Sequence, residues 1–167
     1  IGTLGLFADD FEHFKTLTTP DPITLHKLFS KLKEANYSHI VMEVSSHALD
    51  QFRVADVDFN IAVFTNLSPE HLDYHATVES YFQSKLRLFT MLTINSTAIV
   101  NISDSFGKRI SKKSPAPVVP FSKSNNNSIH YRKIETSMAG IAGEIIAGQN
   151  KYSIKSKLIG DFNSENI

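Results

Sequence analysis

Three positions in the middle of the chain carry side chains that could take part in chemistry. Glu43 ends a short apolar run at residues 39–43, and His71 opens the sequence His-Leu-Asp-Tyr-His after a second apolar run at residues 59–65. Lys85 falls within a predicted helix, on the side where apolar residues recur at helical spacing. These apolar residues are Val78, Tyr81, Phe82, Leu86 and Phe89. The stretch is therefore the first candidate for a functional site.

A lysine on the apolar side of a helix has two explanations. Burial disfavours the charged ammonium group and favours the neutral amine, which is nucleophilic. Alternatively, the aliphatic stem of Lys85 lies along the core and its ammonium group reaches water. Helical periodicity alone favours the second explanation, whereas an acid and two histidines in the same stretch favour a functional site.

The histidines and serines of this stretch also have simpler roles. His71 and His75 could ligate zinc from a helix, but no third ligand follows nearby and the glutamate of H-E-x-x-H is missing. From the residues alone, one of the two histidines is structural. Ser45 or Ser46 could cap the next helix, and neither lies in a G-x-S-x-G nucleophile motif.

The strands and helices expected around these residues alternate along the chain. This order predicts an α/β fold with a doubly wound, mostly parallel sheet flanked by helices. Asp21 as N-cap and Pro22 at the first helical position begin a helix that runs to about Ala35. Buried strands are expected at residues 39–43, 59–65, 97–101 and 117–121. A small antiparallel sheet is expected at residues 129–134, 143–147 and 152–158, with a turn at 148–150.

Composition limits the classes of function. The 167 residues can build one sizeable core, and the formal net charge of zero favours neither a nucleic-acid tail nor a membrane-surface patch. No apolar run is long enough to span a bilayer, and we expect no signal peptide. Without cysteine, a disulfide framework and a thiolate metal site are both impossible. We therefore expect a cytoplasmic protein that binds no nucleic acid and does not insert into a membrane.

Several motifs, taken in order, resemble the central domain of the Mur ligase family. The matching segments are Thr18-Thr19-Pro20-Asp21, MEVSSHAL, Gln51-Phe52-Arg53, FTNLSPEHLDYH, SKLRLF and Leu158-Ile159-Gly160-Asp161-Phe162-Asn163. The spacing of 14 positions from His71 to Lys85 also fits the family pattern. The resemblance is weakest from Ser103 to Ser156, and it is closest to the members that add the third residue of the peptidoglycan stem peptide.

The resemblance implies an ATP-dependent amide ligase of cell-wall synthesis that works through an acyl phosphate. Its substrates would be UDP-N-acetylmuramoyl-L-alanyl-D-glutamate and a diamino acid, meso-diaminopimelate or, as the alternative, lysine. Glu43, His71 and Lys85 would act in catalysis and with Mg²⁺, Lys85 being carbamylated. The residues that would bind the muramoyl-peptide are Thr18, Thr19, Ser45, Gln51 and Arg53, and those near the nucleotide are Asn163 and Asn166.

The resemblance also implies a domain organisation. No G-x-x-x-x-G-K-[ST] phosphate loop is present, and the nearest candidate, Gly107-Lys108-Arg109, lacks the first glycine and the hydroxyl residue. We expect residues 1–167 to be a partial central, ATP-binding domain, inactive by itself and monomeric. The N-terminal UDP-binding domain, the phosphate loop and the C-terminal domain would lie outside it.

Three other functions are weaker alternatives. A folylpolyglutamate-synthase-like ligase would share the overall reaction scheme, but HLDYH and SSHALDQFR are typical of the muramoyl-peptide enzymes. A metal-dependent hydrolase with a carbamylated lysine usually shows a His-x-His pair, and no two histidines here are two residues apart. The third alternative is a non-catalytic α/β binding module.

Overall fold

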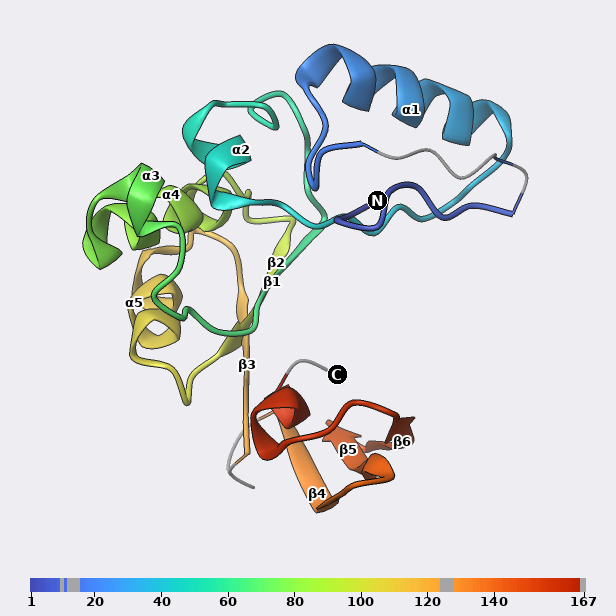
Figure 1. Ribbon diagram of the computed structural model, residues 1–167, viewed down its shortest axis with the longest axis vertical. Coiled ribbons are helices and arrows are strands. Elements are labelled where there is room, and N and C mark those ends of the chain that lie inside the picture. Colours follow the sequence, from blue (N-terminus) through green and yellow to red (C-terminus); the bar gives the residue numbers. More distant parts are fainter. Residues whose placement is uncertain (10, 12–15, 124–127, 166–167) are drawn as a thin grey trace. The chain divides into compact units, whose positions relative to one another are not determined.

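The computed structural model describes residues 1–9, 11, 16–123 and 128–165 (Figure 1). The chain divides into two compact units: unit 1 is Ile1–Val57 with Asp73–Arg87, and unit 2 is Asp58–Leu72 with Leu88–Ile167. The strands of the sheet all belong to unit 2, so unit 1 packs around helices and loops of its own.

The first helix of unit 1, α1 (Pro22–Glu34), forms as the sequence predicts. The carboxylate of Asp21 accepts a hydrogen bond from the backbone N–H of Thr24 at 3.0 Å, and Pro22 stands at the start of the helix. Contacts with Thr24 lower the pKa of Asp21, because they stabilise its charged form. Leu25, Leu28 and Leu32 are buried along one side.

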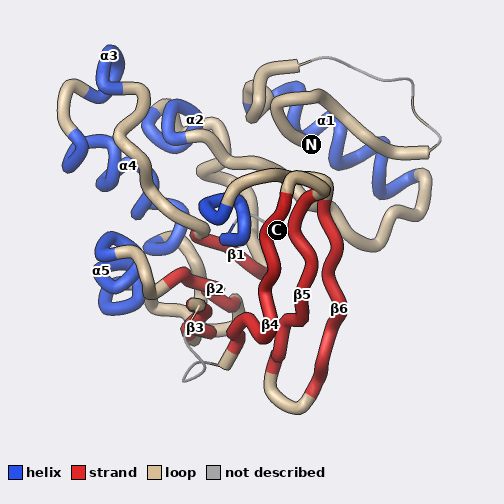
Figure 2. The backbone as a smooth tube through the Cα atoms, turned by 60° about the horizontal axis from the view of Figure 1, so that its bottom comes forward, coloured by secondary structure: helices blue, strands red, loops and turns tan. Residues whose placement is uncertain are grey.

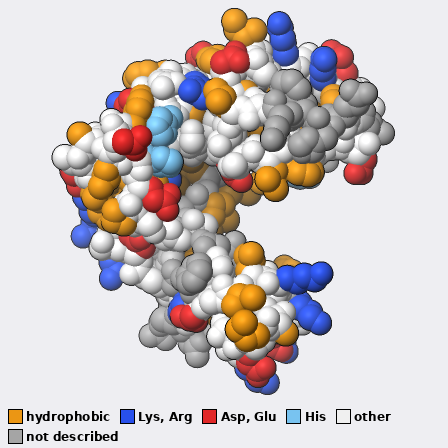
Figure 3. Space-filling model, in the orientation of Figure 1, with side chains coloured by type: hydrophobic (Ala, Val, Ile, Leu, Met, Phe, Trp, Pro, Cys, Tyr) orange, Lys and Arg blue, Asp and Glu red, His pale blue; other side chains and the backbone are white. Residues whose placement is uncertain are grey.

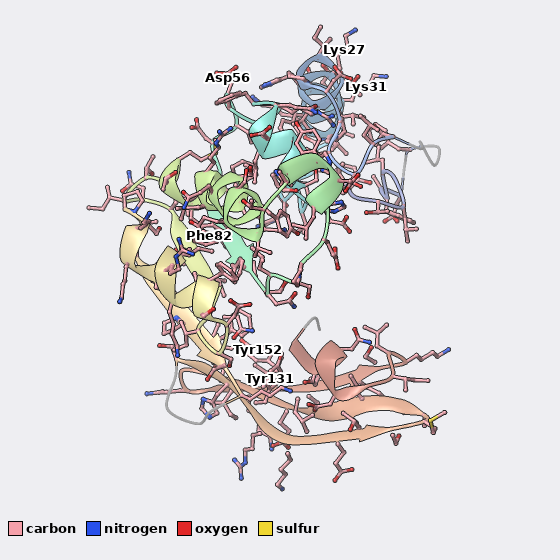
Figure 4. The ribbon with its side chains drawn as sticks, turned by 60° about the vertical axis from the view of Figure 1, so that its left-hand side comes forward. Lys27, Lys31, Asp56, Phe82, Tyr131 and Tyr152 are labelled. Atoms are coloured by element: carbon pink, nitrogen blue, oxygen red, sulfur yellow. The ribbon has the colours of Figure 1, made fainter. Side chains whose placement is uncertain are left out.

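Three more helices carry the motifs singled out in the sequence: α2 (Ser46–Asp50), α3 (Leu72–His75) and α4 (Val78–Thr90). The helix expected around Lys85 is confirmed. Its predicted apolar side is buried at Tyr81, Phe82, Leu86 and Phe89. Phe82, labelled in Figure 4, is fully buried.

The strand expected at residues 39–43 is wrong, because this segment belongs to no strand. Val41 is 85 % exposed, and among the described residues the backbone–backbone hydrogen bonds of the segment go to Ile1. The N-terminal amine of Ile1 donates to the carbonyl of Val41 at 2.8 Å, and the N–H of Glu43 donates to the carbonyl of Ile1 at 2.9 Å. A central strand requires partners along both edges, and a single residue does not supply them.

Unit 2 is built on a six-stranded sheet in the order β1-β2-β3-β4-β5-β6. The strands are β1 (Ile61–Phe64), β2 (Thr97–Asn101), β3 (Val118–Ser122), β4 (Ile129–Ser137), β5 (Gly140–Ala147) and β6 (Asn150–Ser156). The pairs from β1 to β4 are parallel, and β4, β5 and β6 pair antiparallel. The expected α/β sheet, parallel with an antiparallel C-terminal part, is confirmed.

Helix α5 (Ser105–Lys113) packs on β2, and one glycine sets how closely it approaches. The carboxylate of Asp104 caps α5 by accepting from the N–H of Phe106 at 2.6 Å, and it also accepts from the N–H of Leu67 at 3.1 Å. A Cβ placed on Gly107 would lie 1.9 Å from the carbonyl oxygen of Asn101. Only glycine allows this contact between the helix and the end of the strand.

The antiparallel strands form the long hairpins seen in Figure 2. Gly148, with φ of 59°, turns the chain between β5 and β6 in the left-handed conformation that glycine favours. Tyr131, Ile145 and Tyr152 form one row across the three strands, and both tyrosines are labelled in Figure 4. Apolar side chains are visible on the surface of this part in Figure 3. A 3-10 helix, η1 (Asp161–Glu165), follows β6.

Candidate functional site

The side chain of Thr19 is a hydrogen-bonding centre of unit 1. It is fully buried, and its hydroxyl donates to the carbonyl of Glu43 at 3.0 Å and accepts from the N–H of Ser45 at 2.9 Å. The hydroxyl of Ser45 in turn accepts from the N–H of Ala48 at 3.2 Å and caps α2. These contacts join the loop before α1 to the loop before α2.

Arg53 is held against the same centre by its guanidinium group. Nη1 donates to the carbonyl of Thr19 at 2.9 Å, and Nε donates to Oε1 of Gln51 at 3.0 Å. Nη2 donates to the same Oε1. The other N–H groups of this guanidinium have no partner among the described residues, so they can bind an anionic ligand.

The end of α2 explains why Gln51 and Arg53 stand where they do. The N–H of Arg53 donates to the carbonyl of Ala48 at 2.8 Å, and the N–H of Phe52 donates to that of Leu49 at 3.3 Å. Phe52 takes φ of 56°. This is a Schellman motif with a phenylalanine at the position where glycine is usual. The motif turns the backbone sharply between Gln51 and Arg53.

The carboxylate of Glu43 is oriented by a residue near the start of the chain. Oε2 accepts from the hydroxyl of Thr3 at 2.7 Å and from the N–H of Thr3 at 3.1 Å. The hydroxyl of Thr3 also lies 3.2 Å from that of Thr18. Gly2 makes room for the carboxylate, because a Cβ there would meet Oε1 of Glu43 at 2.8 Å. Oε1 has no hydrogen-bond partner among the described residues.

Lys85 and His71 lie in different units. The side chain of Lys85 is half-buried, and its Nζ stands 5.0 Å from the centre of the Tyr81 ring, as in a cation–π contact. His71 is exposed and takes φ of 57° just before α3. Glu43 and Lys85 belong to unit 1 and His71 to unit 2. Their convergence near one end of the sheet therefore stays a prediction.

His75 has a structural role. It is buried, its Nε2 lies 2.9 Å from the hydroxyl of Ser46, and its ring packs 5.3 Å from that of Tyr81. Because His71 precedes α3 and His75 ends it, the two do not form a helical zinc pair. Within the described ranges, no three His, Cys, Asp or Glu side chains cluster in a way that could hold a metal ion.

The remaining predicted site residues lie near the end of the chain. Asn163 is in η1, and its Nδ2 donates to the carbonyl of Ile159 at 2.9 Å. Asn166 lies outside the described residues. Among the helices of the described ranges, none combines the length and apolar character needed to cross a lipid bilayer.

The sequence did not indicate the partners that orient these side chains. Thr3 lies 40 residues before Glu43, and Tyr74 lies 23 residues after Gln51, to which its hydroxyl is hydrogen-bonded. Asp50 accepts a hydrogen bond from the same hydroxyl. Tyr74 lies inside the motif HLDYH and Asp50 inside SSHALDQFR. Their place in these motifs was the only sequence feature that could have marked them as site residues. Thr3 has no such feature.

Comparison with known proteins gives the same family along the whole chain. The Mur ligase middle domain matches residues 1–167. The UDP-N-acetylmuramoyl-L-alanyl-D-glutamate–2,6-diaminopimelate ligase of Geobacter metallireducens is 39 % identical over 156 residues, which cover 90 % of this chain and 30 % of that protein. The ligase of the same name from Pseudomonas aeruginosa is 36 % identical over 170 residues, with coverage of 100 % and 34 %.

Solved structures agree with this assignment. A structure of a UDP-N-acetylmuramoyl-L-alanyl-D-glutamate–2,6-diaminopimelate ligase superposes with a TM-score of 0.83 at 29 % identity, covering 99 % of this chain and 34 % of that one. MurF from Acinetobacter baumannii, with a TM-score of 0.56 and 17 % identity over 64 % of this chain and 23 % of its own, shares the fold. The chain spans about a third of the length of the curated relatives that it matches. It belongs to the Mur ligase middle-domain family.

Proposed function

We propose that this chain is a partial central domain of an ATP-dependent ligase that adds meso-diaminopimelate to UDP-N-acetylmuramoyl-L-alanyl-D-glutamate. Relatives that bear this name match 90 % or more of the chain. The observation that carries the proposal is the hydrogen-bonded group around Thr19, which joins Glu43, Ser45 and Arg53 in unit 1. Motif residues that are distant in the sequence are thereby held in contact.

The group around Thr19 would bind the muramoyl-peptide. The N–H groups of Arg53 that remain beside its bonds to Gln51 and Thr19 suit a carboxylate or phosphate oxygen, because the guanidinium is a planar fork of donors. The hydroxyls of Thr18 and Ser45 would add neutral hydrogen bonds. In the reaction, the terminal carboxylate of the peptide would be phosphorylated by ATP, and the diamino acid's amine would then displace phosphate to form the amide.

Glu43, His71 and Lys85 would form the catalytic and metal-binding set. Magnesium prefers oxygen ligands, and Oε1 of Glu43 is such an oxygen, on a carboxylate whose other oxygen is held by Thr3. Carbamylation would turn the amine of Lys85 into a further oxygen donor, and His71 would complete the set. When bound, magnesium would supply positive charge beside the transferred phosphoryl group.

The nucleotide and the cellular location follow from the same proposal. Asn163 and Asn166 would lie near the base of ATP. The protein would act as a monomer in the cytoplasm, where ATP is available.

A ligation assay on the full-length protein tests the proposal. Purified protein is incubated with UDP-N-acetylmuramoyl-L-alanyl-D-glutamate, ATP, Mg²⁺ and either meso-diaminopimelate or L-lysine, and products are identified by mass. We expect one amide product, formed with diaminopimelate, and one phosphate released per product. Product with lysine alone would correct the third amino acid. Absence of product with both amines, or product only with a folate and glutamate, would overturn the proposal.

A further inference from the structure

The hydroxyl of Tyr74 connects two residues at the carboxyl end of α2. It accepts from Nε2 of Gln51 at 3.3 Å and donates to Oδ2 of Asp50 at 3.0 Å. The ring of Tyr74 packs against that of His47, with the centres 4.1 Å apart. All of these residues belong to unit 1.

Asp50 is fixed from its other side by α4. Oδ1 of Asp50 lies 3.5 Å from Nη1 of Arg87, and the same Nη1 donates to the carbonyls of Leu49 at 3.2 Å and Asp50 at 3.3 Å. The guanidinium of Arg87 also lies over the ring of Phe52, 4.9 Å from its centre. The carboxylate that receives the Tyr74 hydrogen bond is thus held in place.

Arg53, Gln51, Tyr74 and Asp50 form a series of hydrogen bonds with a charged group at each end. These two charged groups, Arg53 and Asp50, fix the direction of every hydrogen bond in the series. A guanidinium has only donors and an ionised carboxylate has only acceptors. Gln51 must therefore turn its Oε1 to Arg53, which leaves its Nε2 to Tyr74. The tyrosine hydroxyl must accept from that nitrogen, so its proton goes to Asp50.

We propose that Tyr74 is a positioning residue for the muramoyl-peptide site: it fixes the amide of Gln51, and through it the guanidinium of Arg53. This inference rests on the proposed function, because it gives Gln51 and Arg53 a common substrate. Without the hydroxyl, Nε2 of Gln51 loses its acceptor and the amide can rotate. Oε1 of Gln51 then no longer holds Nε and Nη2 of Arg53 in one orientation.

The variant Tyr74→Phe in the full-length protein tests the inference. It removes the hydroxyl but keeps the ring beside His47. We expect KM for UDP-N-acetylmuramoyl-L-alanyl-D-glutamate to rise about fivefold, the effect of losing one ordinary hydrogen bond. We expect kcat to stay within about twofold, because the contact aligns bound substrate rather than the transition state. KM for ATP should not change.

Tyr37→Phe is the matched control. Tyr37 lies in the same unit, its ring packs against Phe11 at 6.1 Å, and its hydroxyl makes no hydrogen bond to the described residues. We expect this variant to keep the wild-type KM and kcat. An unchanged KM in Tyr74→Phe, or an equal rise in both variants, would overturn the positioning role.

A second variant shows whether Tyr74 acts through Gln51. In a Gln51→Ala background, Tyr74→Phe should change KM by less than about twofold, because contacting residues in one network are not additive. A full fivefold effect in that background would contradict the inference. An inactive wild type would overturn the proposed function along with it, whereas an active wild type with unchanged Tyr74→Phe would overturn the inference alone.

Discussion

At the residue scale, Lys85 places an aliphatic stem on the apolar side of a helix and a charged group beside an aromatic ring. Its stem continues the apolar side of α4 between Phe82 and Leu86, both buried, and its Nζ faces the ring of Tyr81. A half-buried lysine can therefore stay in the helix whether or not it is modified. The contact explains the position of Lys85 and leaves its proposed chemistry to experiment.

Lys85→Ala in the full-length protein should lower kcat for amide formation by at least about a hundredfold, the usual loss when a transition-state stabilising group is removed. The thermal unfolding midpoint should change little. Millimolar bicarbonate should not restore activity, whereas a short-chain carboxylic acid should restore part of it by supplying oxygen atoms. Lys27→Ala on the exposed side of α1, labelled in Figure 4, is the control. Near-normal turnover of Lys85→Ala would contradict the carbamate role.

At the element scale, backbone contacts decide how α5 meets β2. Gly107 is buried where the helix crosses the end of the strand, against the carbonyl of Asn101. The same position was the nearest sequence candidate for a phosphate loop. Buried inside a helix, the N–H groups of this segment are not arranged as a loop that could cradle a phosphate.

Gly107→Ala should destabilise the chain by about 1–3 kcal/mol, as expected for overpacking. Alanine would gain up to about 1 kcal/mol of helix propensity, but its Cβ would meet backbone that cannot move without shifting α5. Lys108→Ala, on the exposed side of the same helix, should change stability by less than about 0.5 kcal/mol. Urea denaturation measures both, and equal stabilities would show that α5 adjusts freely.

The β5–β6 pair carries a pH-sensitive contact. Nζ of Lys151 donates to Oε1 of Glu144 at 2.6 Å, and this hydrogen bond lowers the pKa of Glu144 below its ordinary value. Because the pKa is lower in the folded state, the stabilising contribution is present above the unfolded-state pKa. It is lost as the pH falls through the folded-state pKa.

Lys151→Ala should therefore raise the pKa of the Glu144 carboxyl group, which NMR titration of its carboxyl carbon measures directly. Because the folded-state and unfolded-state pKa values of Glu144 then nearly coincide, the loss of stability on acidification that comes from Glu144 should be smaller than in the wild type. Lys155→Ala, an exposed lysine on the same strand, should leave the titration of Glu144 nearly unchanged. If the pKa of Glu144 shifted equally in both variants, the cause would be the loss of one positive charge on the strand rather than the loss of this hydrogen bond.

At the scale of the whole molecule, the chain contains the residues proposed to bind the peptide but not the motif that binds phosphates. No G-x-x-x-x-G-K-[ST] sequence occurs among its 167 residues. A phosphate loop supplies most of the backbone N–H donors that hold the β- and γ-phosphates. A contact from Asn163 to the base would not replace them.

The chain of residues 1–167 by itself should consequently bind Mg²⁺–ATP poorly. Calorimetric titration should reveal no micromolar site, whereas the full-length protein should show one. The muramoyl-peptide serves as the internal control, because the group around Thr19 lies entirely within unit 1. Micromolar ATP binding by residues 1–167 would mean that another part of this chain holds the phosphates.

The sequence by itself determined the local elements. Asp21 and Pro22 began α1, the apolar spacing around Lys85 gave α4, and a glycine turn separated β5 from β6. Each of these depends on neighbours within a few residues, so periodicity, caps and turn residues suffice to predict it. Ordered motifs also indicated the family, because their combination is far more specific than any one of them.

Only the tertiary structure decided which polar atoms meet. Thr3 with Glu43, Arg53 with Thr19 and Tyr74 with Gln51 are pairs separated by 40, 34 and 23 residues. Such contacts leave no periodic signal in the chain. Residues 39–43 show the same limit, since their apolar run resembles a strand. A strand also needs ladder partners along its edges, and only the folded chain shows that, among the described residues, the backbone–backbone hydrogen bonds of this segment go to Ile1.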